Sequence, residues 1–307
     1  MQSDATINTR EPARVVAIVL NRNRSDLLAA CLQKLRCQTI PLSAVILVDD
    51  ASTDDSVEGA RSFWPGIHVV ALEEPSGVIA ARNAGLEFAQ SELNFDYVCY
   101  LDNDAFLEPS ALEEMVAAAR ADAEVGMVTP KAYQSIHERR LACAGGMTAN
   151  FGMGLFRDTG SGELDRGQFD EPRDVVACPG FTFLVRKEVV LRVGPFDNGL
   201  RHYGWEDVDY SLRVRKAGFR LRYAPQAVVE HKGGHAGRGI VAAYERAKLR
   251  NLFVLMHRHA SAFQWLCFLG VLPLRCAYVA ARLAGHAMAR RLVMPQRRRS
   301  GVRADSM

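Results

Sequence analysis

The chain has 307 residues, of which 49% are apolar, so it can form one large domain or one domain with an appendage. Its formal net charge is only +3, which excludes general nucleic-acid binding. Its seven cysteines are odd in number and form no CxxC pair, which favours reduced cytosolic thiols over a disulfide framework or a zinc cluster. The N-terminus is polar as far as Pro12 and lacks a signal-peptide core, so we expect residues 1–12 to be disordered.

In the first 130 residues, short apolar runs alternate with segments of helical periodicity. Buried strands are predicted at Val15–Leu20, Ala44–Val48, Ile67–Leu72 and Tyr97–Leu101. Helices are predicted after Ser25, from Gly77 to Gln90 and from Pro109. This alternation predicts an α/β fold with a doubly wound, mostly parallel sheet flanked by helices. Such sheets bind ligands at the carboxyl ends of their strands.

The alternation stops after residue 130. Residues 131–173 are glycine-rich and read as irregular, which is typical of a binding region or a lid. Strands are predicted again at Val175–Cys178 and Phe181–Val185. A helix near 206–217, a strand at Phe219–Tyr223 and a helix from about Ile240 to Arg258 follow.

Two carboxylates end the predicted strand at 97–101. Asp102 and Asp104 are separated by one residue, Asn103, so continued strand geometry points both to the same side. Such a pair repels unless a cation lies between the oxygens, and hard oxygen ligands suit Mg²⁺ or Mn²⁺ bridged to phosphate. The motif also fits a plain polar turn. Asp49 and Asp50 end another predicted strand, and this placement favours the metal-diphosphate interpretation.

A second acidic pair, Glu206-Asp207, opens the predicted helix near residue 206. The helix dipole alone is a sufficient structural reason for acids there. A carboxylate poised over a diphosphate site is also able to take a proton from an attacking hydroxyl. Trp205, just before the pair, is either an apolar face for a sugar ring or part of the core.

Together these motifs resemble the inverting family 2 glycosyltransferases of the GT-A fold, in their rhamnosyltransferase-like branch. The resemblance covers roughly residues 13–260 and depends on the order and spacing of the motifs. The motifs are Asn23–Leu28, Val48–Asp54, Ala81–Gly85, Leu101–Ala105, Pro179–Arg186, Gly194–Asp197, Gly204–Asp209 and Glu230–Gly234. The chain departs from the family pattern at Asn21 and at Pro75-Ser76-Gly77, which puts the nucleotide contact at the second place in doubt.

The resemblance implies a role for each site residue. Asp207 would be the catalytic base, with Glu206 placing the base or the acceptor. Asp102, Asp104 and His231 would hold the metal, although His231 also fits a histidine hydrogen-bonded after a strand. Trp205 and Gly180 would bind the acceptor. The nucleotide sugar would contact Asn21, Asp49, Asp50, Arg82, Asp102, Asn103 and Asp104.

These roles predict a metal-assisted single displacement. A UDP- or dTDP-sugar would donate its sugar to a hydroxyl of a lipid-linked or cell-envelope glycan, with inversion at the anomeric carbon and Mg²⁺ or Mn²⁺ as cofactor. Residues 13–130 would form the nucleotide-sugar half, and residues 131–260 the acceptor-binding and catalytic half. Residues 261–294 would form an apolar and basic helical extension, followed by a basic tail at 295–307.

The C-terminal extension leaves three interpretations open. Residues 262–274 are almost wholly apolar, but Arg275 and Arg282 interrupt the run before it reaches the ~20 residues that span a bilayer. An interfacial helix with arginines on anionic headgroups, a single span and a buried soluble helix all fit. We expect a cytoplasmic protein at the inner face of the plasma membrane.

Three rival functions also fit parts of the sequence. A nucleotidyltransferase would have a glycine-rich loop after the first strand, where this chain has Asn21–Ser25. Sugar transfer to a polyprenyl phosphate would need no base, because the acceptor oxygen is already anionic. A non-catalytic carbohydrate-binding or membrane scaffold protein would be free to lose the four acids that this chain retains.

Overall fold

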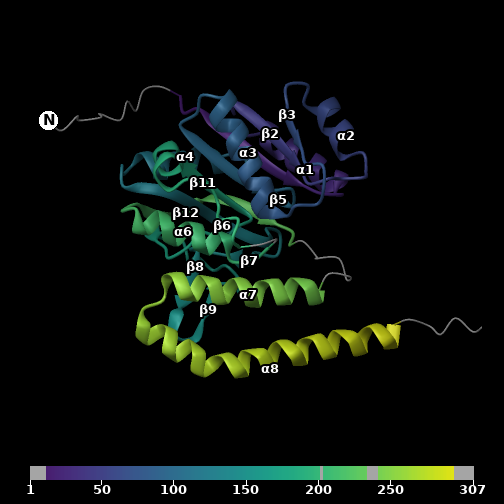
Figure 1. The fold of residues 1–307 in the computed structure, drawn as a ribbon. Helices are drawn as coiled ribbons and strands as arrows, with labels where there is room; N and C mark the ends of the chain where they lie inside the picture. The colour runs from purple at the N-terminus through teal and green to yellow at the C-terminus, as the bar shows by residue number, and fades with distance from the viewer. Residues whose placement is uncertain (1–11, 201–202, 234–240, 294–307) are drawn as a thin grey trace, which may run out of the picture.

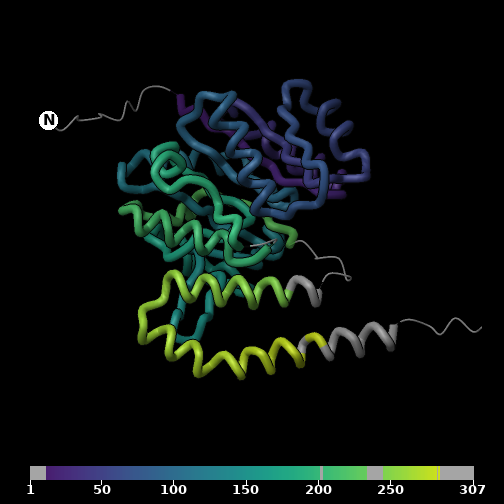
Figure 2. The backbone as a smooth tube through the Cα atoms, viewed as in Figure 1, coloured from purple at the N-terminus to yellow at the C-terminus, as the bar shows by residue number. Residues whose placement is uncertain are grey.

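The computed structural model of the chain describes residues 12–200, 203–233 and 241–293 (Figures 1 and 2). The disorder predicted for the N-terminus concerns residues 1–12, of which 1–11 lie outside this description. The basic tail at 295–307 and Ile240, the predicted start of a helix, also lie outside it. The seven cysteines lie within it, and each is a free thiol.

A ten-stranded sheet forms the centre of the molecule, with the main order β10-β12-β6-β11-β4-β1-β2-β3 (Figure 1). Its strands are β1 (Val15–Asn21), β2 (Ala44–Asp49), β3 (His68–Ala71), β4 (Tyr97–Asp102), β5 (Ala105–Leu107), β6 (Val125–Ser135), β7 (Arg140–Cys143), β10 (Arg173–Asp174), β11 (Thr182–Arg186) and β12 (Arg220–His231). The pairs of β1 with β2 and β4, β2 with β3, and β6 with β12 are parallel. β11 lies antiparallel between β4 and β6, so the sheet is mixed but parallel over its first four paired strands.

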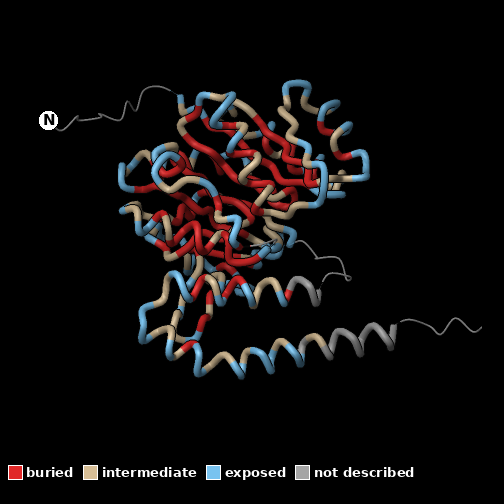
Figure 3. Tube along the Cα trace, viewed as in Figure 1, coloured by how far each residue is buried: buried red, intermediate tan, exposed pale blue. Residues whose placement is uncertain are grey.

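Helices cover both faces of this sheet because its central strands are apolar on both sides. The helices are α1 (Ser25–Arg36), α2 (Ser56–Phe63), α3 (Val78–Glu92), α4 (Ala111–Arg120), α5 (Lys187–Val193) and α6 (Glu206–Lys216). Val15 and Ala17 of β1 share one hydrophobic cluster with α1, α2 and α4. Val16 and Ile18 share another with α3, α5 and α6. Successive side chains of a strand point to opposite faces of the sheet, so each face has its own buried core (Figure 3).

A third layer lies beyond α6. It consists of α7 (Val241–His259), α8 (Ala262–Val293) and a hairpin of β8 (Met147–Asn150) and β9 (Leu155–Asp158), joined by the short 3₁₀ turn η1 (Phe151–Met153). In Figure 1 this hairpin extends from the sheet toward α8. Phe156, Trp205 and Phe268 belong to one hydrophobic cluster that connects the hairpin, α6 and α8.

The structure corrects several expectations for the second half. Residues 131–173 are not irregular, because they contain the end of β6 and all of β7, β8 and β9. The strand expected at Val175–Cys178 is reduced to an isolated bridge between Ala177 and Met147, and β10 ends before it. β12 continues past Tyr223 to His231. The proposed boundary after residue 130 falls inside β6, so the two halves share one sheet.

Candidate active site

Three polar residues meet at the carboxyl edge of the parallel strands. Asn21 ends β1, Asp49 ends β2 and Asp102 ends β4. The strand register pairs Asn21 with Asp49 and places Leu20 opposite Asp102. The parallel register therefore brings side chains together that are far apart in the sequence, at the edge where sheets of this kind bind ligands.

Asp102, Asp104 and His231 form a cluster of possible metal ligands. One ligand atom from each lies within 4.8 Å of the others. β12 runs antiparallel to β5 with His231 opposite Ala105, and this pairing places the imidazole beside Asp104. His231 Nε2 lies 3.4 Å from Asp104 Oδ1, and its ring stacks on Phe181 with centroids 4.4 Å apart.

The charges of this cluster suit a divalent cation. Burial raises the pKa of Asp102 to about 6 against the opposing effect of Arg82, and the neighbouring Asp104 carboxylate raises it further. Burial acts on Asp104 in the same direction, but His231 and Arg24 hold the pKa of Asp104 below its usual value. A cation between the two carboxylates removes their repulsion. Two carboxylate oxygens and one imidazole nitrogen fit Mn²⁺ or Mg²⁺.

Three of the residues expected around the nucleotide, Asn21, Asp49 and Asn103, are joined by hydrogen bonds. Asn103 donates to Asn21 Oδ1 at 2.6 Å, and Asn21 in turn lies 3.2 Å from Asp49 Oδ1. Asp49 also accepts a hydrogen bond from Ser52 N, so its carboxylate fixes the loop after β2.

The side chain of Asp50 does not join this group and faces the start of α3 instead. It accepts hydrogen bonds from the backbone amides of Ser76 and Gly77, at 2.6 and 3.2 Å, at the start of α3. The segment Pro75-Ser76-Gly77, whose nucleotide contact was in doubt, therefore lies against Asp50.

The buried Arg82 forms ion pairs with one acid of each pair, Asp102 and Glu206. Arg82 is 1% exposed, and its guanidinium lies 3.0 Å from Glu206 Oε1 and 3.7 Å from Asp102 Oδ1. Arg82 Nη2 also donates to Gly180 O at 2.7 Å. The predicted contact of Arg82 with the nucleotide stays a prediction. What the structure shows is a buried cation that links Asp102 to Glu206.

Glu206 and Asp207 begin α6 after a strained turn. Trp205 has φ 71° and Gly204 has φ 99°, so two successive residues adopt the left-handed region before the helix starts. Glu206 is 5% exposed and accepts the Gly204 amide at 2.7 Å in addition to its ion pair with Arg82. Its carboxylate is thereby fixed.

Trp205 is packed in the interior. Its Nε1 donates to Lys248 O at 2.9 Å, and its ring lies 5.4 Å from that of Phe156. Of the two interpretations of this residue, the packing supports the core one, and an acceptor contact stays a prediction.

Asp207 differs from Glu206 in its environment. It is half-buried, and its Oδ1 accepts the Val208 amide at 2.9 Å. Burial and the adjacent Glu206 charge raise the pKa of Asp207 to about 7, against the opposing effect of Arg82. A carboxylate with this pKa is suited to accept a proton near neutral pH.

Gly180 lies between Arg82 and Asp207. A Cβ atom at this position would come within 3.0 Å of Arg82 Nη2 and 3.1 Å of Asp207 Oδ2. The predicted acceptor-binding glycine is therefore a place where the backbone approaches both charged groups closely.

Two site residues carried no predicted role. Arg24 Nη1 lies 2.8 Å from Asp104 Oδ2, and its position just after β1 was the signal that could have found it. Asp158 ends β9, and its charge acts on the pKa of Asp207, while its Oδ1 is buried without a hydrogen-bond partner among the described residues. No sequence signal marked Asp158, because residues 131–173 read as irregular.

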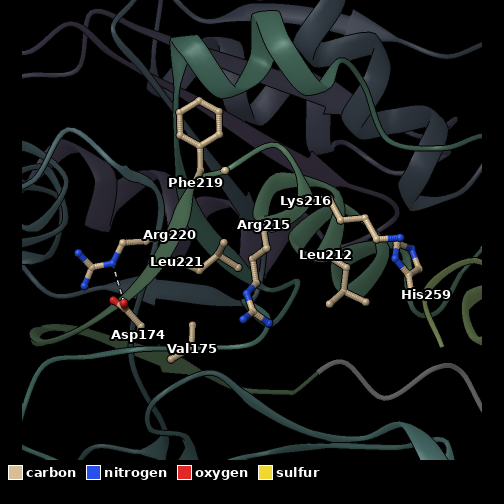
Figure 4. Close-up of a pocket in the computed structure, with 10 residues that line it drawn as sticks. Asp174, Val175, Leu212, Arg215, Lys216, Phe219, Arg220, Leu221 and His259 are labelled. Carbon is tan, nitrogen blue, oxygen red and sulfur yellow. Dashed lines mark hydrogen bonds and ion pairs between the residues drawn. The ribbon is translucent and has the colours of Figure 1, made fainter. Parts of the chain in front are cut away.

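A separate pocket of about 410 Å³ opens between α6 and β12 (Figure 4). Leu212, Phe219 and His259 contribute to its lining, and Arg220 pairs with Asp174 at its edge. The residues that line it include none of the predicted site residues within the described ranges. We therefore place the candidate site at the strand ends and not in this pocket.

Comparison with known proteins bears on the class of this fold. A crystal structure of GalNAc-T7 with UDP, GalNAc and Mn²⁺ superimposes with a TM-score of 0.60 at 20% identity, covering 73% of this chain and 44% of that one. The mannosyltransferase PcManGT from Pyrobaculum calidifontis, in complex with GDP-Man and Mn²⁺, gives a TM-score of 0.55 at 19% identity, covering 91% of this chain and 81% of that one. The mixed, parallel-dominated sheet and these neighbours define a GT-A fold, as predicted.

The family follows from sequence. Residues 16–194 match Glycosyl transferase family 2. The pre-mycofactocin glycosyltransferase of Mycobacterium tuberculosis is 31% identical over 196 residues, which cover 61% of this chain and 37% of that protein. The bovine polypeptide N-acetylgalactosaminyltransferase 6 is 27% identical over 72% of this chain and 37% of its own length. The chain thus matches little more than a third of these relatives, and it belongs to glycosyl transferase family 2.

Proposed function

We propose that the protein is an inverting glycosyltransferase. It moves a sugar from a UDP- or dTDP-sugar to a hydroxyl of a lipid-linked or cell-envelope glycan, in the manner of the rhamnosyltransferase-like branch. One observation carries this proposal: Arg82 joins Asp102 of the metal cluster to Glu206, beside Asp207, whose pKa is about 7. One buried cation thus connects the proposed donor site to the residue next to the proposed base.

Each acid has a different task in this proposal. Asp102, Asp104 and His231 hold Mn²⁺ or Mg²⁺, which when bound neutralises the leaving diphosphate. Asn21, Asp49, Asp50 and Asn103 shape the strand-end surface against the nucleoside. These groups bind the donor and take no proton.

Asp207 takes the proton of the acceptor hydroxyl as that oxygen attacks the anomeric carbon. The new C–O bond forms on the face opposite the departing diphosphate, so the configuration inverts. Glu206 stays paired with Arg82 and places the base. The single displacement needs no second nucleophilic carboxylate.

We place the reaction at the inner face of the plasma membrane, on an anionic surface. Among the described helices, α8 contains one segment, Ala262–Ala281, that is long and apolar enough to cross a membrane by length and composition. An acceptor carried on a lipid would be reached from such a surface.

The donor is identified by thermal shift. We expect UDP- or dTDP-sugars to raise the melting temperature in the presence of Mn²⁺, and Asp104→Ala to abolish the metal-dependent part of that rise. Asp207→Asn should keep the whole shift, because Asp207 lies outside the metal cluster. A shift that is equal in wild type and Asp104→Ala contradicts the metal site.

Catalysis is tested with the same variants and the donor so found. Asp207→Asn should lose transfer by about 10²–10⁴-fold, the range that a positioned general base typically contributes. Full turnover by Asp207→Asn would contradict the hydroxyl acceptor and favour transfer to a polyprenyl phosphate. Donor binding without any transfer or slow hydrolysis in the wild type would favour a non-catalytic binding protein.

A further inference from the structure

The outward surface of α8 is uncharged between residues 262 and 281. Between residues 262 and 281 the exposed positions are Ala262, Phe263, Leu266, Leu269, Gly270, Pro273, Leu274, Cys276, Ala277, Tyr278, Ala280 and Ala281. Phe263 is 76% exposed and Leu274 72%, values that a water-facing helix of a soluble domain seldom combines with uncharged neighbours. Figure 3 shows this run of exposed residues on the side of α8 away from the body.

The inward surface of the same helix is packed against protein. Phe268 is fully buried, and Trp265 and Leu272 pack on the cluster that contains it. α8 lies against α7 and against η1 at the tip of the β8–β9 hairpin (Figure 1). At Gly154, with φ 58°, a Cβ atom would come within 2.7 Å of Phe268, so the hairpin touches the helix closely.

The charge within this segment is also turned inward. Arg275 donates to the carbonyl oxygens of Met153, the last residue of η1, and of Gly154, which follows it. Beyond residue 281 the sequence contains seven arginines and one acid, Asp305. The helix thus offers an uncharged outer face followed by a cationic sequence, which matches acyl chains next to anionic headgroups.

The packing decides between lying in a membrane and crossing it. Twenty helical residues are long enough for a span of about 30 Å, so length alone does not decide. A span would carry the β8–β9 hairpin and η1 to the same depth as α8. β8 and β9 form a two-stranded sheet, and open sheet edges do not occur in lipid-exposed hydrocarbon.

We propose that α8 lies in the plane of an anionic membrane, with the face of Phe263, Leu266, Leu274 and Tyr278 in the lipid and the face of Phe268 on the protein. This inference deepens the proposed function, on which the lipid acceptor depends. Phe268 shares a cluster with Trp205 and Val208, which flank Glu206 and Asp207. The membrane helix and the start of α6 therefore belong to one packed unit, on the acceptor side of the site.

Vesicle sedimentation of the full-length protein tests the surface. We expect wild type to partition onto phosphatidylcholine vesicles with about a third phosphatidylglycerol, and the double variant Leu266→Glu/Leu274→Glu to partition at least about tenfold less. Leu191→Glu is the matched control, because Leu191 is 68% exposed on α5, away from α8. Circular dichroism should show the same fold for all three proteins.

Depth measurements test the orientation. Single cysteines at 266, 270, 274 and 277, in a background with Cys37, Cys267 and Cys276 replaced by alanine, carry a fluorophore that is quenched by lipids labelled at known depths. An in-plane helix gives one shallow depth at all four sites. A depth that changes by about 1.5 Å per residue means a span and overturns the proposal.

Two further results would overturn it. One is the absence of wild-type partitioning onto anionic vesicles, and the other is an equal loss in Leu191→Glu and in the double variant. Neither measurement uses a donor or an acceptor, and Asp207→Asn should bind vesicles like wild type. Failure of the membrane inference is therefore separable from failure of the transferase assignment.

Discussion

Glu206 and Asp207 are neighbours with different surroundings, and the roles proposed for them follow from that difference. Glu206 is fixed by Arg82 and by the Gly204 amide, so its charge is fully compensated. Asp207 receives one amide and is exposed to the Glu206 charge, and its pKa rises to about 7. Neighbouring carboxylates in environments as different as these are suited to different tasks in a reaction.

The raised pKa of Asp207 predicts the pH dependence of transfer. The base must be ionised, and burial together with Glu206 favours its protonated form, so activity is lost as the pH falls. We expect kcat/KM to drop about tenfold per pH unit below roughly pH 7 and to level off above it. The measurement is initial rate against pH from 5.5 to 8.5 at saturating Mn²⁺. A flat profile over that range contradicts the assignment of Asp207.

Gly180 allows a second prediction. In Gly180→Ala the new methyl carbon would lie 3.0 Å from Arg82 Nη2 and 3.1 Å from Asp207 Oδ2. Both distances are shorter than ordinary van der Waals contact, so a neighbouring group must shift. We expect transfer to fall by about 10–10²-fold, because small displacements of reacting groups are costly. Steady-state kinetics measure the loss.

Gly59→Ala is the matched control for that variant. Gly59 lies in α2, and nothing lies within 4 Å of a Cβ atom added there. It should keep full activity and gain about 0.5–1 kcal/mol in free energy of unfolding, since alanine favours helix. Equal activity in both glycine variants would contradict the crowding at Gly180.

The acidic residues of the candidate site were predictable from the sequence, but the ion pairs that join them were not. Asp49, Asp102 and Asp207 were found because strand ends and helix starts have recognisable patterns. The joining role of Arg82 was not predictable, since it depends on α3, β4 and α6 meeting in space. Asp158 was missed for a similar reason: short polar strands such as β9 have little periodicity to read.

At the scale of elements, α7 supports the turn that starts α6. Asn251 is fully buried, and its side-chain amide donates to the carbonyls of Tyr203 and Gly204 at 3.1 and 3.2 Å. Trp205 adds a bond to Lys248 O from the other side. These contacts offset the strain of the left-handed Trp205, a backbone conformation that costs of order 1–3 kcal/mol in a residue other than glycine.

Asn251→Ala should therefore damage catalysis from a distance. It removes two buried hydrogen bonds, at a cost of about 1–3 kcal/mol in stability, and loosens the start of α6. We expect kcat to fall while the donor affinity measured by thermal shift changes little, because the proposed nucleotide surface lies on β1, β2 and β4. Arg246→Ala, at an exposed position of the same helix, is the control. Equal losses in both variants would contradict the positioning role of Asn251.

The elements themselves were predictable to different degrees. The first four strands and α1, α3 and α4 follow from continuous apolar runs and helical spacing. The segment 131–173 was wrongly read as irregular, because its strands are short and partly exposed, and glycine marks their turns. The sequence also placed β12 eight residues short of its end, since Pro225 and Gln226 interrupt the apolar pattern where the strand has a bulge.

At the scale of the molecule, one face of α8 is exposed and the other is packed against the body of the protein. The contrast between Phe263 and Phe268, five residues apart, makes this measurable. Phe268→Ala removes a fully buried ring from the cluster that contains Trp205 and should cost about 3–5 kcal/mol in free energy of unfolding. Phe263→Ala should change that free energy by less than about 0.5 kcal/mol.

Urea unfolding of both variants without lipid provides the measurement. Phe268→Ala should also reduce transfer, because the packing beneath Trp205 is lost. A destabilisation that is the same at both positions would mean that α8 is not docked on the body as the structure shows.

The antiparallel insertion of β11 has a kinetic consequence. β11 pairs with β4 over five residues, from Thr182 opposite Leu101 to Arg186 opposite Tyr97, and Asp102 N donates to Phe181 O at 2.9 Å. β4 of the proposed donor-binding half and β11 of the proposed acceptor-binding half are thus neighbouring strands of one ladder. A hinge motion between β4 and β11 would break these shared backbone hydrogen bonds, so we expect substrate entry and product release to occur through movements of side chains and loops.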